Sequence, residues 1–180
     1  MTFLGDDWHM GPDGLRFRHA ARVLVFDPRG RLLLARGRDL HRPTRHWWFT
    51  IGGGRDSGES AREAASRELR EETGLVVAPA DLIGPVISRA AIFDFAAETV
   101  RQYEEFFTVR LTQAADFDTS GWSHIEKEMI TELRWWDLRD LAATAEQVYP
   151  EGLAEIATRL DQGWDGRLIE LGEVHDPETE

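Results

Sequence analysis

The sequence predicts an α/β protein built around one well-marked helix. Ser60 to Thr73 contains no Gly or Pro and is rich in Ala, Glu, Arg and Leu, which are all good helix formers. Apolar runs bounded by turn residues precede and follow this helix, as expected for strands. The 180 residues, 42% of them hydrophobic, are enough for one well-buried core and short for two. We therefore expect a single domain over residues 1–180.

The segment before the helix predicts a hairpin and one further strand. Ala20 to Asp27 and Arg31 to Arg36 are apolar runs joined by Asp27-Pro28-Arg29-Gly30, which is a turn signature. Trp47 to Ile51 is expected to form a short strand that leads into the glycine run Gly52-Gly53-Gly54. Residues 1–15 are polar and Gly-rich, and we expect them to form a flexible arm.

The segment after the helix predicts more strands and two further helices. The strand candidates are Leu82 to Phe93, Val100 to Leu111 and Leu133 to Leu138. Asp137 is suited to cap a short helix through Ala145, and Pro150 suits the first turn of a final helix that reaches Leu160. Glu173 to Glu180 is expected to be a frayed acidic tail.

The helix over Ser60 to Thr73 has start and stop signals at its two ends. Ser57 or Ser60 serves as the N-cap, and Gly74 stands where a left-handed C-cap belongs. One apolar stripe, which faces the core, recurs every four residues at Ala61, Ala65 and Leu69.

A second face of this helix carries carboxylates. Glu68, Glu71 and Glu72 stand at i, i+3 and i+4, so their side chains converge. Three like charges at this spacing repel one another unless a positive charge lies among them. Oxygen ligands alone suit a hard cation, Mg²⁺ or Mn²⁺. The alternative is a solvated surface helix, but the glycines that precede it favour a site, because they let the backbone approach a ligand closely.

The full pattern runs from Gly53 through Glu59 to the segment Arg67-Glu68-Leu69-Arg70-Glu71-Glu72-Thr73-Gly74-Leu75. At average residue usage, chance would give this spacing less than ~10⁻⁷ of the time per start position. The pattern resembles the Nudix box of the Nudix hydrolases at every motif position. The resemblance implies the Nudix fold, a mixed β-sheet sandwiched between α-helices, with its core at about residues 18–162.

The resemblance also implies roles for individual residues. The implied metal ligands are Gly53, through its carbonyl, and Glu59, Glu68, Glu71 and Glu72. Glu68 binds metal or acts as the base, and Glu59 is an auxiliary ligand. Arg67 orients a neighbouring carboxylate. Members of the family often place one more metal-binding or base glutamate in a later loop, and here Glu128 is preferred, with Glu126 second.

Substrate contacts are expected upstream of the glycine run. Arg36, Arg42 and Arg45 offer guanidinium groups that suit phosphate, although an exposed basic loop is the equal alternative. Trp47 and Trp48 are adjacent on a strand, so one faces the core and the other the opposite side. We take Trp48 as the tryptophan that stacks on a base or ring, with ordinary packing, the more frequent use of tryptophan, as the alternative.

Composition excludes several classes of protein. A net charge of −12 disfavours bulk nucleic acid and anionic membranes as partners. No stretch approaches the ~20 apolar residues of a membrane span, and the first residues do not resemble a signal peptide. We expect a cytoplasmic protein, and the absence of cysteine excludes disulfides and thiolate metal sites. We expect the protein to be a monomer or a homodimer. The aromatic residues from Tyr103 to Phe107 are expected either at an interface or under a helix.

The resemblance implies a Mg²⁺- or Mn²⁺-dependent hydrolase. It would cleave a diphosphate bond in a nucleoside diphosphate linked to another moiety, or in a nucleoside triphosphate. A carboxylate, Glu68 or a loop glutamate such as Glu128, would accept the proton of the attacking water. One alternative is a catalytically silent Nudix-fold module that senses or binds a nucleotide, and another is an acidic scaffold that binds divalent cations without hydrolysis. The intact set of box glutamates favours the enzyme.

Overall fold

The computed structural model describes residues 4–5, 7–40, 42–95, 98–113 and 115–175. Its strands are β1 His9–Met10, β2 Arg16–Phe26, β3 Leu32–Arg38, β4 His46–Phe49, β5 Ile51–Gly54, β6 Ile83–Phe95, β7 Glu98–Arg110, β8 Ile130–Trp136, β9 Val148–Tyr149 and β10 Ile169–His175. Its helices are α1 Ala61–Thr73, α2 His124–Met129, α3 Leu138–Ala143 and α4 Leu153–Asp161, with a 3₁₀ turn at Pro79–Asp81.

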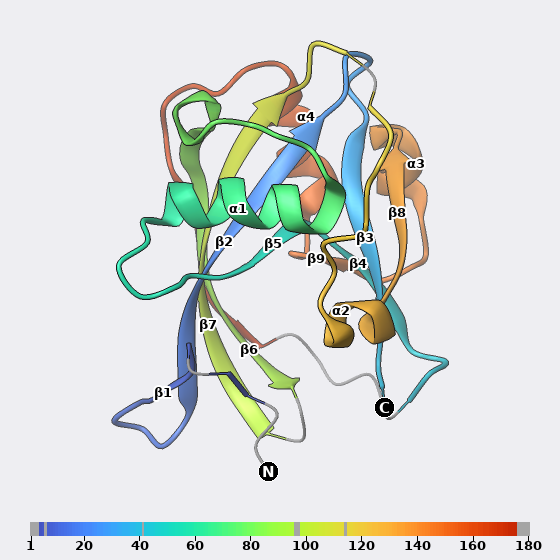
Figure 1. The fold of residues 1–180 in the computed structure, drawn as a ribbon. Helices are drawn as coiled ribbons and strands as arrows, with labels where there is room; N and C mark the ends of the chain where they lie inside the picture. Colours follow the sequence, from blue (N-terminus) through green and yellow to red (C-terminus); the bar gives the residue numbers. More distant parts are fainter. Residues whose placement is uncertain (1–3, 6, 41, 96–97, 114, 176–180) are drawn as a thin grey trace.

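The strands join into one strongly twisted sheet (Figure 1). The main path is β10-β6-β7-β2-β3-β4-β9, with β1 and β5 beside β2 and β8 beside β3. The pairs β2–β7, β6–β10 and β4–β9 are parallel, whereas the other pairs are antiparallel. The sheet is therefore mixed, and the predicted α/β class is confirmed.

Two hydrophobic cores lie on opposite faces of the sheet. The first packs α1 against the sheet through the predicted stripe of Ala61, Ala65 and Leu69, all buried. The second packs α3 and α4 against the other face, with Trp48 and Phe106 among its largest side chains. Figure 1 shows α1 in front of the sheet and α4 behind it. This is the expected sandwich of a sheet between helices.

The strands around the hairpin follow the prediction with one change. Phe26 of β2 pairs with Leu32 of β3 in the expected antiparallel hairpin. The strand expected over Trp47 to Ile51 is broken at Thr50, because the chain changes its pairing partner there. Before Thr50, β4 pairs with β3 and β9, whereas after it β5 pairs with β2.

Three local predictions were wrong. The last helix begins at Leu153 rather than at Pro150, because Gly152, its N-cap, has a φ of +77° that ends the preceding turn. Glu173–His175 belong to β10, parallel to β6, and only residues 176–180 of the expected tail lie outside the described residues. The expected arm over residues 1–15 contains β1 and the buried Trp8.

The aromatic stretch of β7 divides between the two faces of the sheet. Phe107 belongs to the core under α1, and Phe106 to the core under α4. Tyr103 remains 38% exposed. Packing under helices therefore accounts for the two phenylalanines. Among the described residues, no helix has the length and apolar character needed to cross a membrane.

We predict that Ser60→Ala lowers the free energy of unfolding by ~1 kcal/mol. The Ser60 hydroxyl accepts the Glu63 N–H at 3.2 Å, and the Glu63 carboxylate accepts the Ser60 N–H at 2.9 Å, which together form a capping box. Ser57→Ala in the exposed turn before the helix is the matched control, with an expected change below ~0.5 kcal/mol. Urea unfolding followed by circular dichroism measures both, and equal losses would contradict this assignment of the cap.

Candidate active site

Helix α1 presents two buried glutamates to the glycine run of β5. Glu68 and Glu72 are 8% and 3% exposed. They stand four residues apart, so their positions differ by only about 40° around the helix axis, whereas Glu71 lies about 60° to the other side of Glu68. Helix geometry therefore sends Glu68 and Glu72 toward the sheet and Glu71 toward the rim, where its side chain is 42% exposed.

The glycine run fits closely against these carboxylates. The Gly52 N–H donates to Glu72 Oε2 at 2.9 Å. Gly52 has a φ of +135°, and a Cβ there would lie 2.1 Å from the Ala21 carbonyl oxygen. A Cβ on Gly53 would lie 2.7 Å from Glu68 Oε2. Glycine is required at position 52, where the backbone of β5 lies in direct contact with β2, and at position 53 a Cβ would displace the Glu68 carboxylate.

A third carboxylate reaches the site from α2. Glu126 joins Glu68 and Glu72, and one oxygen of each lies within 4.8 Å of the others. Two contacts anchor the loop before α2 to the end of α1: Trp122 Nε1 donates to the Glu72 carbonyl at 2.6 Å, and the Asp118 N–H donates to the Thr73 carbonyl at 2.8 Å. The Ser123–Glu126 capping box then begins α2 and orients Glu126.

Burial disfavours the charged forms of Glu68 and Glu72. Burial raises the pKa of Glu72 from its ordinary 4.5 to about 8, and the nearby Glu68 adds to the effect. Burial likewise raises the pKa of Glu68, although the Arg67 guanidinium opposes the shift. Three converging carboxylates with oxygen donors only fit a hard divalent cation such as Mg²⁺ or Mn²⁺. Such a cation would stabilise the charged forms that burial disfavours.

Arg67 organises the carboxylates on the outer side of the cluster. Its guanidinium donates twice to Glu59, with both distances 2.9 Å. It also donates to Glu68 at 2.6 Å, to Glu71 at 3.1 Å and to the Gly54 carbonyl at 2.9 Å. The bonds from Arg67 lower the pKa of Glu59, and those same bonds raise the pKa of Arg67. Glu59 and Glu71 therefore lie against Arg67, and the three-carboxylate cluster consists of Glu68, Glu72 and Glu126.

The structure brings Glu126, and not the preferred Glu128, to the cluster. The segment expected to be a loop forms α2, and two positions along a helix turn a side chain about 200° around its axis. Glu128 consequently points outward, 3.5 Å from His124, with its side chain 51% exposed. The sequence Ser123-His124-Ile125-Glu126 is itself a capping-box signature, and it could have indicated the start of the helix.

The predicted substrate residues fall in two places. Trp48 is fully buried in the core under α4, with its indole N–H donating to Glu146 at 3.0 Å, so its assignment as a stacking residue was wrong. Alternation along β4 placed Trp48, rather than its neighbour Trp47, in this core.

The predicted arginines each lie beside a carboxylate. Arg36 pairs with the same Glu146 at 3.1 Å. Arg42 and Arg45, in the loop between β3 and β4, pair with Asp39 at 3.7 and 3.9 Å.

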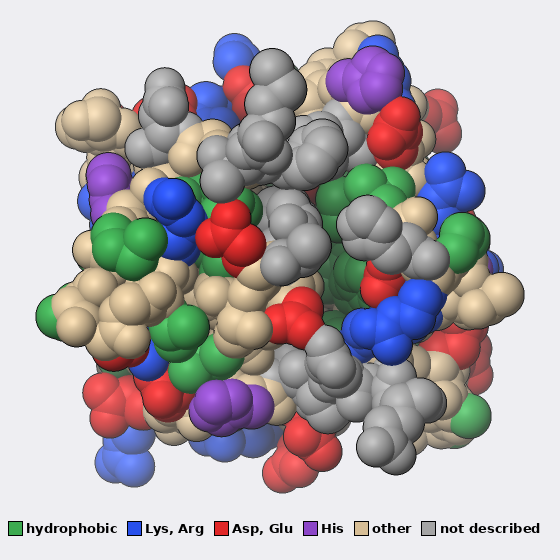
Figure 2. Space-filling model, turned by 90° about the horizontal axis from the view of Figure 1, so that it is seen from below, with side chains coloured by type: hydrophobic (Ala, Val, Ile, Leu, Met, Phe, Trp, Pro, Cys, Tyr) green, Lys and Arg blue, Asp and Glu red, His purple; other side chains and the backbone are tan. Residues whose placement is uncertain are grey.

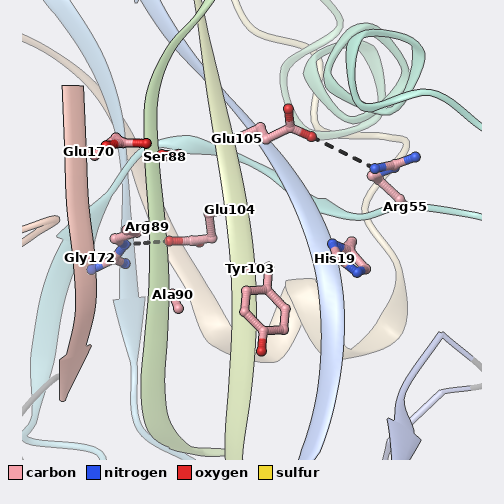
Figure 3. A pocket seen from close by; sticks show the side chains of 10 residues that line it. All are labelled: His19, Arg55, Ser88, Arg89, Ala90, Tyr103, Glu104, Glu105, Glu170 and Gly172. Carbon is pink, nitrogen blue, oxygen red and sulfur yellow. Dashed lines mark hydrogen bonds and ion pairs between the residues drawn. The ribbon is translucent and has the colours of Figure 1, made fainter. Parts of the chain in front are cut away.

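The lower face of the molecule is chemically mixed. In Figure 2 the described basic, acidic and hydrophobic side chains of this face alternate without a continuous basic patch. A separate open cavity of about 630 Å³ lies over β6, β7 and β10. Figure 3 shows its lining, which includes His19, Tyr103 and the ion pair Arg55–Glu105, and the box glutamates are not part of it.

Comparison with known proteins identifies the family. The family model for the NUDIX domain matches residues 16–156. An RNA pyrophosphohydrolase from Saccharophagus degradans is 28% identical over 178 residues, which cover 87% of this chain and 94% of that protein. The uncharacterised Nudix hydrolase YvcI of Bacillus subtilis is 36% identical over 70 residues, which are 33% of this chain and 44% of that protein. The chain thus spans less than half the length of YvcI.

Solved structures agree on the fold. The MutT protein from Bacillus halodurans superposes with a TM-score of 0.58 at 20% identity, over 87% of this chain and 88% of that one. The chain therefore belongs to the Nudix hydrolase family.

We predict that the metal-free protein loses stability as the pH rises from ~5 to ~8. Because the pKa of Glu72 is raised on folding to about 8, its contribution is fully present below 4.5 and is lost as the pH rises through 8. One such group changes the free energy of unfolding by up to ~1.4 kcal/mol per pH unit. Denaturant unfolding in a chelator should show a shallower pH dependence for Glu72→Gln than for the wild type. Parallel curves for the two proteins would refute the shift.

Proposed function

We propose that the chain hydrolyses a diphosphate bond of a nucleotide with the help of Mg²⁺ or Mn²⁺. The cluster of Glu68, Glu72 and Glu126 against the glycine run supports this proposal most directly. Glu68 and Glu72, together with the Gly53 carbonyl, would hold the cation. The bound cation would neutralise charge on the diphosphate and acidify a water molecule.

The structure suggests different roles for the three glutamates. Glu72 and Glu68 are buried and held in place by the Gly52 N–H and by Arg67, which suits residues that hold a cation in fixed geometry. Glu126 lies on a short helix and is only partly buried, so water can reach it. We assign Glu126 as the group that accepts the proton of the attacking water while the bond between phosphorus and the bridging oxygen breaks.

Arg67, Glu59 and Glu71 support this arrangement from the outer side. Arg67 holds Glu68 directly, and Glu59 holds Arg67 through two hydrogen bonds. Glu71, whose side chain is 42% exposed, would bind a further cation that arrives with the substrate. Arg42 and Arg45 remain the proposed phosphate contacts, because their pairs with Asp39 are long and a phosphate oxygen would compete for the same guanidinium groups.

Two classes of substrate follow from the site and the relatives. The first is a small nucleotide, either a nucleoside triphosphate or a nucleoside diphosphate linked to another group. The second is the 5′ end of an RNA that carries a triphosphate, and the similarity to RNA pyrophosphohydrolases over most of the chain favours it. The net charge of −12 opposes extensive contacts with an RNA backbone but not the capture of one phosphorylated end.

We predict that Glu126→Gln lowers kcat by ~10²-fold or more, because it removes the proposed proton acceptor. Glu128→Gln on the same short helix is the matched control and should stay within about threefold of the wild type. Affinity for Mn²⁺, measured by calorimetry without nucleotide, should fall much more in Glu72→Gln than in Glu126→Gln. A Glu128→Gln variant as impaired as Glu126→Gln would contradict the assignment.

Product analysis separates the substrate classes. We expect chromatography to show a nucleoside monophosphate among the products when small nucleotides are supplied with Mg²⁺ or Mn²⁺. RNA with a 5′-triphosphate, supplied in a parallel reaction, should become a 5′-monophosphate if it is the better substrate. Binding of nucleotides without any cleavage in the whole panel would favour the silent binding module instead.

A further inference from the structure

A buried ion network lies directly behind the glycine run. Glu104 of β7 is 2% exposed, and it accepts hydrogen bonds from Arg22 Nε at 2.8 Å and from Arg89 Nε at 2.5 Å. Gln102 donates to the same carboxylate at 2.7 Å and accepts from Arg18 at 2.6 Å. Figure 3 shows Glu104 reaching from β7 to Arg89 on β6. The network therefore joins three strands, β2, β6 and β7.

The two arginines that donate to Glu104 favour its ionised form. Burial raises its pKa, but the attraction of Arg22 and Arg89 outweighs burial, so the pKa of Glu104 lies below its ordinary value. A buried ion pair of this kind is weak evidence for stability, because desolvation offsets most of the attraction between the charges. Stability alone therefore does not account for this buried network.

Arg22 connects this network to the active site. While its Nε donates to Glu104, its Nη1 donates to the Thr50 carbonyl at 3.1 Å and to the Gly52 carbonyl at 2.9 Å. Gly52 is the residue whose N–H donates to Glu72. The two peptide groups of Gly52 are thus each held by a hydrogen bond, one to Arg22 and one to Glu72.

Rotation of the backbone at Gly52 would disturb the proposed cation site. Gly52 has a φ of +135°, a region that glycine adopts readily, so steric limits alone do not fix its backbone. Pairing with β2 and the hydrogen bond from Arg22 hold it in place. Rotation of the peptide before Gly52 would turn its N–H away from Glu72, and rotation of the peptide after it would shift Gly53, which lies against Glu68.

We infer that Arg22 and Glu104 are positioning residues that orient Gly52 and, through it, Glu72 for cation binding. Glu104 fixes the guanidinium plane, and the guanidinium fork fixes the carbonyl groups of Thr50 and Gly52. Neither residue touches the cation or the substrate in this role. The inference rests on the proposed function, since it takes Glu72 as a cation ligand. Partners of this outer kind typically change metal affinity by 10- to 100-fold when they are replaced.

The test measures Mn²⁺ binding by calorimetry without nucleotide, together with the melting temperature. We expect Glu104→Gln to weaken Mn²⁺ binding by about tenfold or more. Arg22→Lys keeps the positive charge but loses the fork, so it should weaken Mn²⁺ binding while it retains the long-range attraction to Glu72. With saturating metal, both variants should recover most of kcat, with the nucleotide KM within about threefold of wild type.

A matched control comes from the same two strands. Arg16 of β2 pairs with Glu98 of β7 at 3.2 Å, but their side chains are 31% and 38% exposed. Arg16 lies opposite Val100, whereas the glycine run pairs with the later part of β2, residues 20–22. Glu98→Gln and Arg16→Lys should leave Mn²⁺ affinity within about twofold of wild type. A lower melting temperature in Glu104→Gln with unchanged Mn²⁺ affinity would show a purely structural role and overturn the inference.

The outcomes also distinguish this inference from the proposed function. If Glu72→Gln leaves Mn²⁺ binding intact, the cation site itself is wrong. If Glu72→Gln abolishes binding while Arg22→Lys and Glu104→Gln bind normally, only the positioning role fails. Should Glu104→Gln not fold, Arg22→Lys decides the question alone, since normal Mn²⁺ affinity in that variant overturns the inference.

Discussion

The burial of two carboxylates away from water is the constraint on which the rest of this structure depends. Glu68 and Glu72 lie together out of water, and neither helix α1 nor the core under it benefits from their charges. The surrounding parts compensate for this cost. Arg67 approaches from the outer side, the Gly52 N–H from the sheet, and glycines at 52 and 53 leave space for the carboxylates. The burial of these carboxylates lowers local stability at the site where we propose that a cation binds.

The sequence alone predicted an element correctly where the contacts that form the element are local. The ends of α1 depend on Ser60, Glu63 and Gly74, which all lie within one turn of the helix termini; Gly74 was predicted as the C-cap, and Ser60 was one of the two N-cap candidates. The hairpin of β2 and β3 depends on the turn at Asp27 to Gly30. Helical spacing alone shows that the side chains of Glu68 and Glu72 lie on the same face of α1. The family resemblance then supplied the fold, because a motif of this length is specific.

The sequence was insufficient where a side chain's environment depends on distant contacts. Alternation shows that Trp47 and Trp48 face opposite sides, but only the packing of α4 determines which side is buried. The choice between Glu126 and Glu128 depends on the anchoring of Trp122 to the end of α1, about 50 residues away. The contact of Arg22 with Glu104 spans 82 residues and has no local signature. Strand β10 was missed for the same reason, because its partner β6 is remote in the chain.

The change of strand partner at Thr50 separates two tasks that adjoin in the sequence. Strand β4 pairs with β3 and β9, whereas β5 pairs with β2. The loop before β4, which carries the proposed phosphate contacts, is therefore connected to a different part of the sheet from the glycines of the proposed cation site. Changes in the length or sequence of this loop can leave the pairing of β5 with β2 intact. The division gives the loop room to vary, in evolution or in a designed library, while β5 keeps its place beside α1.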